Sequence, residues 1–213
     1  KEKYKVNVKL TNNMFLMYYC IYYIMYSESR FDETGRSDKT VKYVYKLKNV
    51  DEDAVKKSLI QNGANPEVIS KNLAELKANK ISQKRPNEIV LGADSVIDLN
   101  GEIISKPKNR EEAFNILKKL NGKKHYLISS VCISRDGMMI WNYTDKAVLT
   151  MKNMKEEDLE NYLKQIKDKD LYAYNVYQIE GLGKTLFSNI EGDKDTIMGL
   201  PIKKIKEYLA TLK

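Results

Sequence analysis

The chain has 213 residues, of which 42% are hydrophobic and 31% charged, an ordinary globular composition with enough length for one sizeable core. Its formal net charge of +8 suits an anionic partner, whether nucleic acid, an anionic membrane surface or a polyanionic small molecule such as a nucleotide. The lysines are spread along the chain without a dense basic block, so part of this excess is solvated surface. We therefore predict a single domain over residues 1–213.

The cysteines argue against a cysteine-ligated zinc site and favour a reducing compartment. The chain has two, Cys20 and Cys132, each inside an apolar stretch and with no zinc-ligand spacing around it. Isolated buried thiols are typical of a reducing compartment. We predict a cytoplasmic location.

Residues 14–26, MFLMYYCIYYIMY, follow a basic stretch and have two interpretations. The segment is too short for a membrane span, so we predict no membrane association. A basic stretch before an apolar one is also the order of a secretory signal, although several tyrosines and the following SESR weaken that interpretation. We prefer a buried strand, with residues 1–20 as an atypical N-terminal extension.

Hydrophobic spacing predicts the next elements in chain order. Two helices are expected at 53–62 and 66–81, the second starting at Asn65-Pro66. A buried strand follows at 87–99, and Asn100-Gly101 predicts a type I′ turn into a return strand at 102–107.

The second half of the chain continues to alternate between helices and strands. We expect a helix at 109–122 with Asn109 as its cap, strands at 125–135 and 138–151, a helix at 156–166, short strands near 176–188 and a final helix at 202–212. This order predicts an α/β fold.

Two charged residues flank the predicted hairpin. Asp94 lies in the apolar strand and Lys106 at the end of its return strand, where a small anion would meet both. Taken singly, each is also compatible with an ordinary turn or surface residue. The lone histidine, His125, has no partner at metal-ligand spacing, so a structural or surface role is favoured.

A longer pattern resembles a known family. Residues 92–131, GADSVIDLNGEIISKPKNREEAFNILKKLNGKKHYLISSV, are similar to the core of the Maf proteins. The likeness covers about Asn49 to the C-terminus and includes NVDED at 49–53, LAELKANKI at 73–81, QIEGLGKTLFSNIEGD at 178–193 and IMGLPIKKI at 197–205. It implies a Maf/inosine-triphosphatase-like α/β fold, with an elongated mixed sheet, flanking helices and a cleft between two lobes.

The resemblance also implies an activity. Maf proteins cleave a nucleoside triphosphate to the monophosphate and pyrophosphate with a divalent metal, Mg²⁺ or Mn²⁺. Glu52 and Asp94 match the family's functional carboxylates, and a hard cation takes one or two carboxylates together with substrate phosphates. Asp94 is thus implied as the catalytic residue that orients or deprotonates water, and both carboxylates as metal ligands.

Further residues match the family's substrate-binding positions. Lys77 and Lys106 match its conserved lysines, which neutralise phosphate charge in phosphoryl transfer. Glu180 stands where the family carries Gln or Glu, as a contact to the base or to metal-bound water, and a structural role is the alternative.

The resemblance weakens over residues 21–48, a divergent N-terminal loop region. Ser27 and Ser29 match the family's Ser-x-Ser-x-x-Arg phosphate loop, whereas Arg30 falls on the usual proline position and Asp32 replaces an arginine. This charge reversal disfavours a bound phosphate unless Arg30 or Arg36 substitutes.

Three functions therefore remain under consideration. The first is an active nucleotide pyrophosphatase, with a nucleoside triphosphate as partner and a homodimer as the family's common assembly. The second is a degenerate Maf-like protein that binds nucleotides but turns them over little. The third is a basic RNA-binding or interaction module, which the position of the tyrosines in apolar strands disfavours, so we expect no nucleic acid. The stretch QIEGLGKTLF leans towards the 7-methyl-GTP branch of the family over the dTTP and UTP branch.

Overall fold

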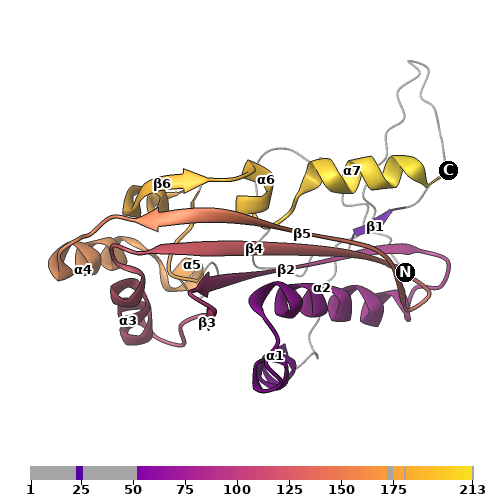
Figure 1. Cartoon of the computed structure of the whole chain (residues 1–213), viewed down its shortest axis with the longest axis horizontal. Coiled ribbons are helices and arrows are strands. Elements are labelled where there is room, and N and C mark those ends of the chain that lie inside the picture. The colour runs from indigo at the N-terminus through magenta and orange to yellow at the C-terminus, as the bar shows by residue number, and fades with distance from the viewer. Residues whose placement is uncertain (1–22, 26–51, 172–174, 180, 213) are drawn as a thin grey trace, which may run out of the picture.

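The computed structural model describes residues 23–25, 52–171, 175–179 and 181–212. The strands are β1 Tyr23–Met25, β2 Ile89–Leu99, β3 Glu102–Ile104, β4 Lys124–Arg135, β5 Met138–Met151 and β6 Phe187–Glu191. The helices are α1 Glu52–Gln61, α2 Pro66–Ser82, α3 Arg110–Leu120, α4 Glu156–Gln165, α5 Asp168–Leu171, η1 Leu182–Leu186, α6 Lys194–Ile197 and α7 Ile202–Thr211. The predicted α/β fold class is confirmed (Figure 1).

The sheet follows the order β1-β2-β4-β5-β6, and β3 pairs with the end of β2 that precedes the turn. Every pairing among the described strands is antiparallel, where the family resemblance implied a mixed sheet. Tight turns account for part of this pattern. Asn100 and Gly101 both have positive φ, at 54° and 89°, which confirms the predicted type I′ turn between β2 and β3. Asp136 and Gly137, with φ of 52° and 83°, make the corresponding turn between β4 and β5.

Side chains alternate between the two faces of the sheet along each strand. Leu91 pairs with Ile133, and both pack with α7 in one core cluster. The next pair, Gly92 and Cys132, faces the other way, because successive side chains of a strand point to opposite faces. Cys132 packs there against two alanines of α2, Ala74 and Ala78. Figure 1 shows α2 along one side of the long strands and α7 along the other.

A second and larger core lies at the other end of the strands. It joins Leu127 and Leu149 of the sheet to Leu117 of α3 and Leu159 of α4, all four nearly inaccessible to solvent. The sheet therefore carries two core regions along its length. The two lobes that the resemblance implied stay a prediction. The cleft between the lobes stays a prediction.

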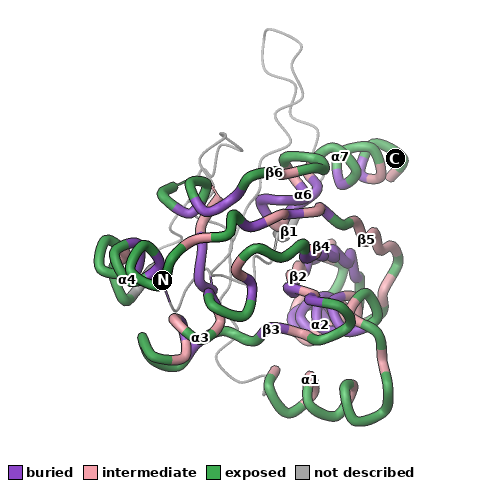
Figure 2. Tube along the Cα trace, turned by 60° about the vertical axis from the view of Figure 1, so that its left-hand side comes forward, coloured by how far each residue is buried: buried purple, intermediate pink, exposed green. Residues whose placement is uncertain are grey.

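The two helices that precede β2 differ in burial. Figure 2 shows α1 as largely exposed and α2 as largely buried. The N-terminus of α2 is capped as predicted, because the Asn65 side chain accepts a hydrogen bond from the Val68 amide at 2.9 Å. α2 therefore forms a fixed layer against the sheet.

The backbones of α2 and β2 approach each other closely at Gly92. A Cβ atom at this position would lie 2.4 Å from the carbonyl oxygen of Ala74 and 2.7 Å from the amide nitrogen of Ala78. Both are backbone atoms, so the whole helix would have to move. The glycine thus sets the distance between α2 and β2.

Gly92→Ala is expected to lower the free energy of unfolding by about 1–3 kcal/mol, the usual cost of overpacking a core. Urea unfolding measures this loss, and any activity that depends on contacts between α2 and β2 should fall with it. Gly181→Ala is the control, because its added Cβ would meet nothing closer than the Gln178 Oε1 atom at 3.6 Å. Equal stability of the two variants would contradict the close approach.

Several predicted boundaries require correction. The return strand ends at Ile104, so Ser105 and Lys106 lie beyond it. Residues 176–188 hold the 3₁₀ turn η1 where short strands were expected, and the strand there begins only at Phe187. Within residues 14–26, the strand interpretation is confirmed for Tyr23–Met25, which pairs with β2.

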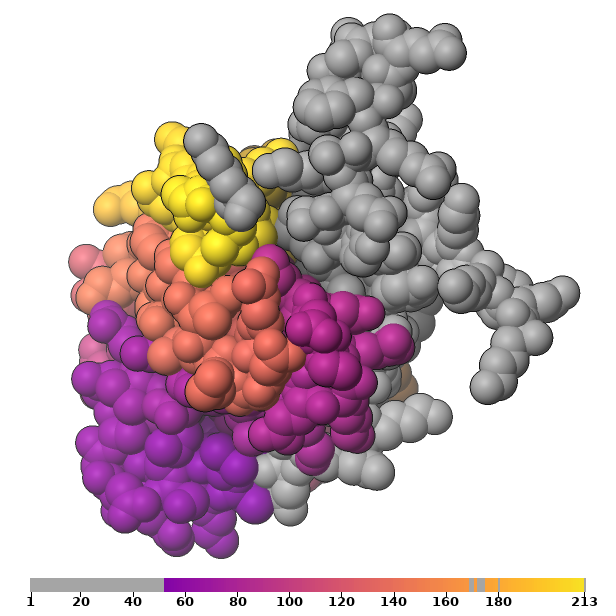
Figure 3. Space-filling view, turned by 90° about the vertical axis from the view of Figure 1, so that its right-hand side faces the viewer, coloured from indigo at the N-terminus to yellow at the C-terminus, as the bar shows by residue number. Residues whose placement is uncertain are grey.

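The far end of the sheet carries α7 and the hairpin of β4 and β5. Figure 3 looks onto this end, where the two lie side by side. Trp141 of β5 stacks on Tyr208 of α7, with ring centroids 4.8 Å apart. Among the helices of the described residues, none has the length and apolarity that a membrane span requires.

Candidate functional site

A buried lysine joins two carboxylates at the interface between α1, α2 and β2. Lys77 of α2, with 5% of its side chain exposed, places Nζ 2.6 Å from Asp94 Oδ1 and 3.0 Å from Glu52 Oε2. We call Glu52, Lys77 and Asp94 the carboxylate–lysine cluster. Three residues predicted from the family resemblance are thus brought together.

Each member of the cluster is positioned by its element. Asp94 is two residues after Gly92 on β2, so its side chain points to the same face of the sheet, towards α2. The close packing of α2 at Gly92 brings Lys77 within reach of Asp94. The Ser70 hydroxyl of α2 donates a hydrogen bond to the carbonyl oxygen of Asp94 at 3.0 Å, which fixes the strand against the helix. Glu52 is the first residue of α1.

Burial raises the pKa of Asp94 above its ordinary value. The charge and hydrogen bond of Lys77 lower it again, the nearby Glu52 carboxylate raises it, and the Lys106 charge lowers it. A carboxylate with a raised pKa in a confined site is a typical proton acceptor in catalysis. Asp94 is therefore the strongest candidate for a general base among the described residues.

Lys106 approaches the cluster from the segment after β3. Ile104, the last residue of β3, pairs with Ile97 of β2, and Lys106 follows shortly after it. Its charge acts on the pKa of Asp94, so the two side chains are close enough to interact electrostatically. The predicted proximity of Asp94 and Lys106 is consistent with this interaction.

Sequence reasoning missed Lys56 and Ser105. Lys56 lies one helical turn after Glu52 on α1, and its Nζ donates to Ser105 Oγ at 3.0 Å. Burial lowers the pKa of Lys56, the charges of Asp94 and Asp53 raise it, and the charge of Lys106 lowers it. The helical spacing between Glu52 and Lys56 was the available signal.

Four predicted site residues lie outside the described residues, namely Ser27, Ser29, Arg30 and Glu180. Their proposed contacts with phosphate, base or metal-bound water stay predictions.

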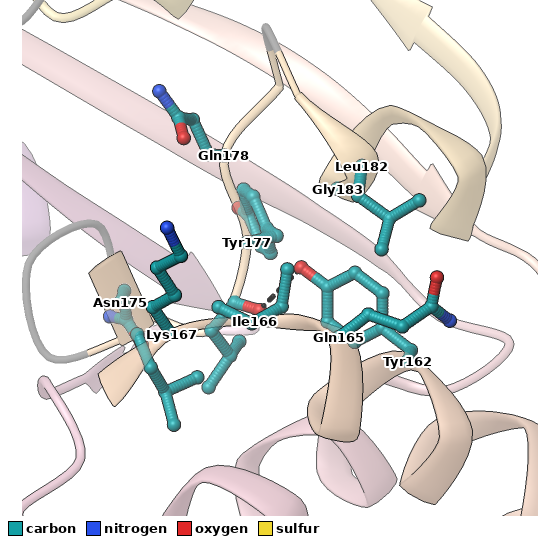
Figure 4. Close-up of a pocket in the computed structure, with 11 residues that line it drawn as sticks. Tyr162, Gln165, Ile166, Lys167, Asn175, Tyr177, Gln178, Leu182 and Gly183 are labelled. Atoms are coloured by element: carbon teal, nitrogen blue, oxygen red, sulfur yellow. Dashed lines mark hydrogen bonds between the residues drawn. The ribbon is translucent and has the colours of Figure 1, made fainter. Parts of the chain in front are cut away.

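A separate pocket of about 130 Å³ lies between α4 and the segment before η1 (Figure 4). The Tyr162 hydroxyl donates to the carbonyl oxygen of Val176 at 3.0 Å along its wall. Asn175, another wall residue, donates from Nδ2 to the carbonyl oxygen of Ile104 at 3.5 Å. This hydrogen bond joins the pocket wall to β3, the strand that leads to Lys106.

His125 has the structural role favoured from the sequence. Its side chain is fully buried, and its Nε2 atom shares a hydrogen bond of 3.0 Å with the Tyr177 hydroxyl. Burial lowers the pKa of His125 to about 4, so the ring is neutral at physiological pH.

The described residues contain no group of three or more His, Cys, Asp or Glu side chains arranged to hold a metal ion. The two carboxylates of the cluster nevertheless both lie within ion-pair distance of the single Lys77 Nζ atom. The Glu52 carboxylate raises the pKa of Asp94, and a bound cation would offset this repulsion between the two carboxylates.

Comparison with known proteins adds a family and curated relatives. The family model described as Maf-like protein matches residues 36–212. A protein of Pelagibacter ubique named nucleoside triphosphate pyrophosphatase is 67% identical over 190 residues, covering 89% of this chain and 97% of that protein. A protein of the same name from Paramagnetospirillum magneticum is 41% identical over 160 residues, covering 75% and 82%.

A relative with a more specific name is also similar. The 7-methyl-GTP pyrophosphatase of Brucella abortus is 35% identical over 179 residues, covering 84% of this chain and 90% of that protein. The family match contains the carboxylate–lysine cluster, Lys56 and Lys106, and it begins after Ser27, Ser29 and Arg30. The extent of the family match and the identity to these relatives show that the chain belongs to the Maf-like protein family.

Proposed function

We propose that this chain hydrolyses nucleoside triphosphates to nucleoside monophosphates and pyrophosphate. The observation that carries the proposal is the carboxylate–lysine cluster, in which buried Lys77 contacts both Asp94 and Glu52. The family membership and the names of its relatives, nucleoside triphosphate pyrophosphatase among them, support the same activity.

Asp94 is the proposed general base. Its raised pKa suits it to accept a proton from the attacking water, and its position on the rigid strand β2 fixes the direction of attack. Lys77 and Lys106 supply positive charge for the triphosphate oxygens, on which negative charge must be neutralised during phosphoryl transfer. Ser27, Ser29 and Arg30 are proposed as further phosphate contacts, and Glu180 as a contact to the base or to bound water.

A divalent cation fits the donor set of this site. Mg²⁺ and Mn²⁺ take oxygen ligands, and Mg²⁺ is commonly held by one or two carboxylates together with substrate phosphates and waters. Glu52 and Asp94 would hold it, since both carboxylates contact the same Lys77 Nζ atom and therefore lie close to each other. A bound cation would polarise the phosphate oxygens and neutralise their charge.

A panel of purified protein against triphosphates tests the activity. We expect pyrophosphate release from at least one of dTTP, UTP and 7-methyl-GTP with Mg²⁺ or Mn²⁺, and loss of release on adding EDTA. Mass spectrometry should find the monophosphate and no diphosphate. Binding of nucleotide without release would favour the degenerate Maf-like protein, and binding of RNA with a steep salt dependence and no release would favour the interaction module.

The other properties expected from the sequence are not decided by the activity. A single domain over residues 1–213, a homodimer and a cytoplasmic location stay predictions, and so does the absence of a nucleic-acid partner. The preferred base is the property that the panel decides.

A further inference from the structure

One face of α1 is directed at the carboxylate–lysine cluster. Glu52 and Lys56 are separated by one helical turn, so their side chains lie on the same face of the helix. The contact of Glu52 Oε2 with Lys77 Nζ at 3.0 Å turns this face towards α2 and β2. Lys56 accordingly reaches across to Ser105 Oγ at 3.0 Å, directly before Lys106 in the sequence.

Lys56 and Lys106 therefore approach the same site from different elements. The loss of solvent around Lys56 disfavours its protonated form, and the Lys106 charge disfavours it further. Asp94 and Asp53 compensate for part of this cost. Two ammonium groups that repel each other beside a catalytic carboxylate would be stabilised together by an anion placed between them.

We propose that Lys56 is a further phosphate-binding residue of this site, which contacts the phosphate chain of the substrate together with Lys106. The proposal rests on the proposed function and adds to it a cation that the sequence comparison with Maf proteins did not indicate. The juxtaposition of Lys56 Nζ with Ser105, next to Lys106, carries it.

The hydrogen bonding of Lys56 leaves capacity for this role. An ammonium group has three donors, and within the described residues Ser105 Oγ accepts from one of them. Lys77 differs in having charged partners, because its ammonium group contacts two carboxylates. Lys56 thus has a neutral partner that orients it and leaves donors for phosphate oxygens.

The test compares Lys56→Met with Lys57→Met in the full chain. Lys57 is the next residue of α1 and is exposed, so the pair removes the same charge from the same helix with and without the proposed contact. Inorganic tripolyphosphate is the probe, and isothermal titration calorimetry with Mg²⁺ present gives its Kd. We expect Lys56→Met to weaken binding about tenfold, as for loss of one charge-assisted hydrogen bond, and Lys57→Met to change it by less than about twofold.

Nucleotide kinetics supply a second readout. Lys56→Met should raise KM by about the same factor for a purine and a pyrimidine triphosphate, because the phosphate chain is common to both. Lys56→Arg, which keeps the charge, should recover most of the loss. Melting temperatures check that all variants are folded.

The outcomes separate this inference from the proposed function. Equal Kd values for Lys56→Met and Lys57→Met would overturn the inference, as would a KM effect confined to one base or a parent protein that does not bind tripolyphosphate. A parent protein that binds tripolyphosphate but releases no pyrophosphate from any nucleotide would overturn the proposed function, while the comparison of Kd values would still decide the role of Lys56.

Discussion

Replacing Asp94 by asparagine is expected to lower kcat for pyrophosphate release by about 10²-fold or more with little change in fold. Asparagine keeps the Oδ1 atom that accepts a hydrogen bond from Lys77 Nζ, at 2.6 Å in the parent protein. It cannot accept a proton from water, and it removes the charge that would bind a cation. Steady-state kinetics with Mg²⁺ and a thermal melt of each protein measure the two effects.

Asp98→Asn is the matched control for this substitution. Asp98 lies on the same strand and loses the same charge, but its Oδ1 atom accepts from the Gly101 amide in the turn, at 2.6 Å, rather than from the cluster. The kcat of the Asp98→Asn variant for pyrophosphate release should stay within about twofold of that of the parent protein. An Asp94→Asn protein with activity within a few-fold of the parent would refute Asp94 as the general base.

Local chemistry made the hairpin and the capped helices predictable. Asn100 and Gly101 tolerate positive φ, so the turn and the register of β2 with β3 follow from two residues. Asn109 caps α3 by accepting from the Glu112 amide at 2.8 Å, as the sequence indicated. Such features depend on neighbours in the chain, which a single sequence displays.

The hairpin alone suggested Asp94 and Lys106, but the rest of the site could be predicted only through the family resemblance. Periodicity places Lys77 on a helix and Asp94 on a strand, but it does not say which face of the sheet that helix covers. The packing of α2 against Gly92 decides this, and an interior glycine in a strand was the one local sign of a close approach. Lys56 was missed for the same reason, because its importance depends on how α1 docks.

The wrong boundaries also have physical causes. The return strand was expected to run to Pro107, but β3 ends at Ile104, the last apolar residue of that stretch, beyond which Ser105 accepts the hydrogen bond from Lys56. In residues 176–188, Gly183 packs so closely on the backbone of Gln178 that a Cβ atom would lie 2.6 Å from its nitrogen. This contact belongs to a compact turn, which the alternation of apolar residues did not reveal.

Lys77→Met is expected to lower the free energy of unfolding by about 3–5 kcal/mol near pH 8, the usual cost of breaking a buried ion pair. Methionine fills most of the volume of the lysine stem, so the loss comes mainly from charge. The substitution leaves Asp94, with 12% of its side chain exposed, and Glu52 without the cation that both contact. Urea unfolding in the presence of EDTA measures the loss.

The pH dependence of this loss identifies its cause. Burial raises the pKa of Asp94 in the folded protein, and Lys77 lowers it, so the substitution should raise it further. A carboxyl group whose pKa is higher in the folded than in the unfolded state binds protons preferentially when folded, and it therefore stabilises the fold as pH falls through that pKa. The stability difference between Lys77→Met and the parent should shrink from about pH 8 towards about pH 5.

Two further variants and a metal titration complete the test of Lys77. Lys57→Met, which removes an exposed lysine, should leave stability nearly unchanged at every pH. Adding Asp94→Asn to Lys77→Met should recover part of the loss, because one of the two carboxylates that contacted Lys77 is then replaced by a neutral amide.

Mn²⁺ should recover stability in Lys77→Met but not in the double variant, since a cation held by Glu52 and Asp94 would replace the missing ammonium group. A loss that is constant with pH and insensitive to Mn²⁺ would mean that Lys77 contributes through packing, and that the two carboxylates do not form a cation site.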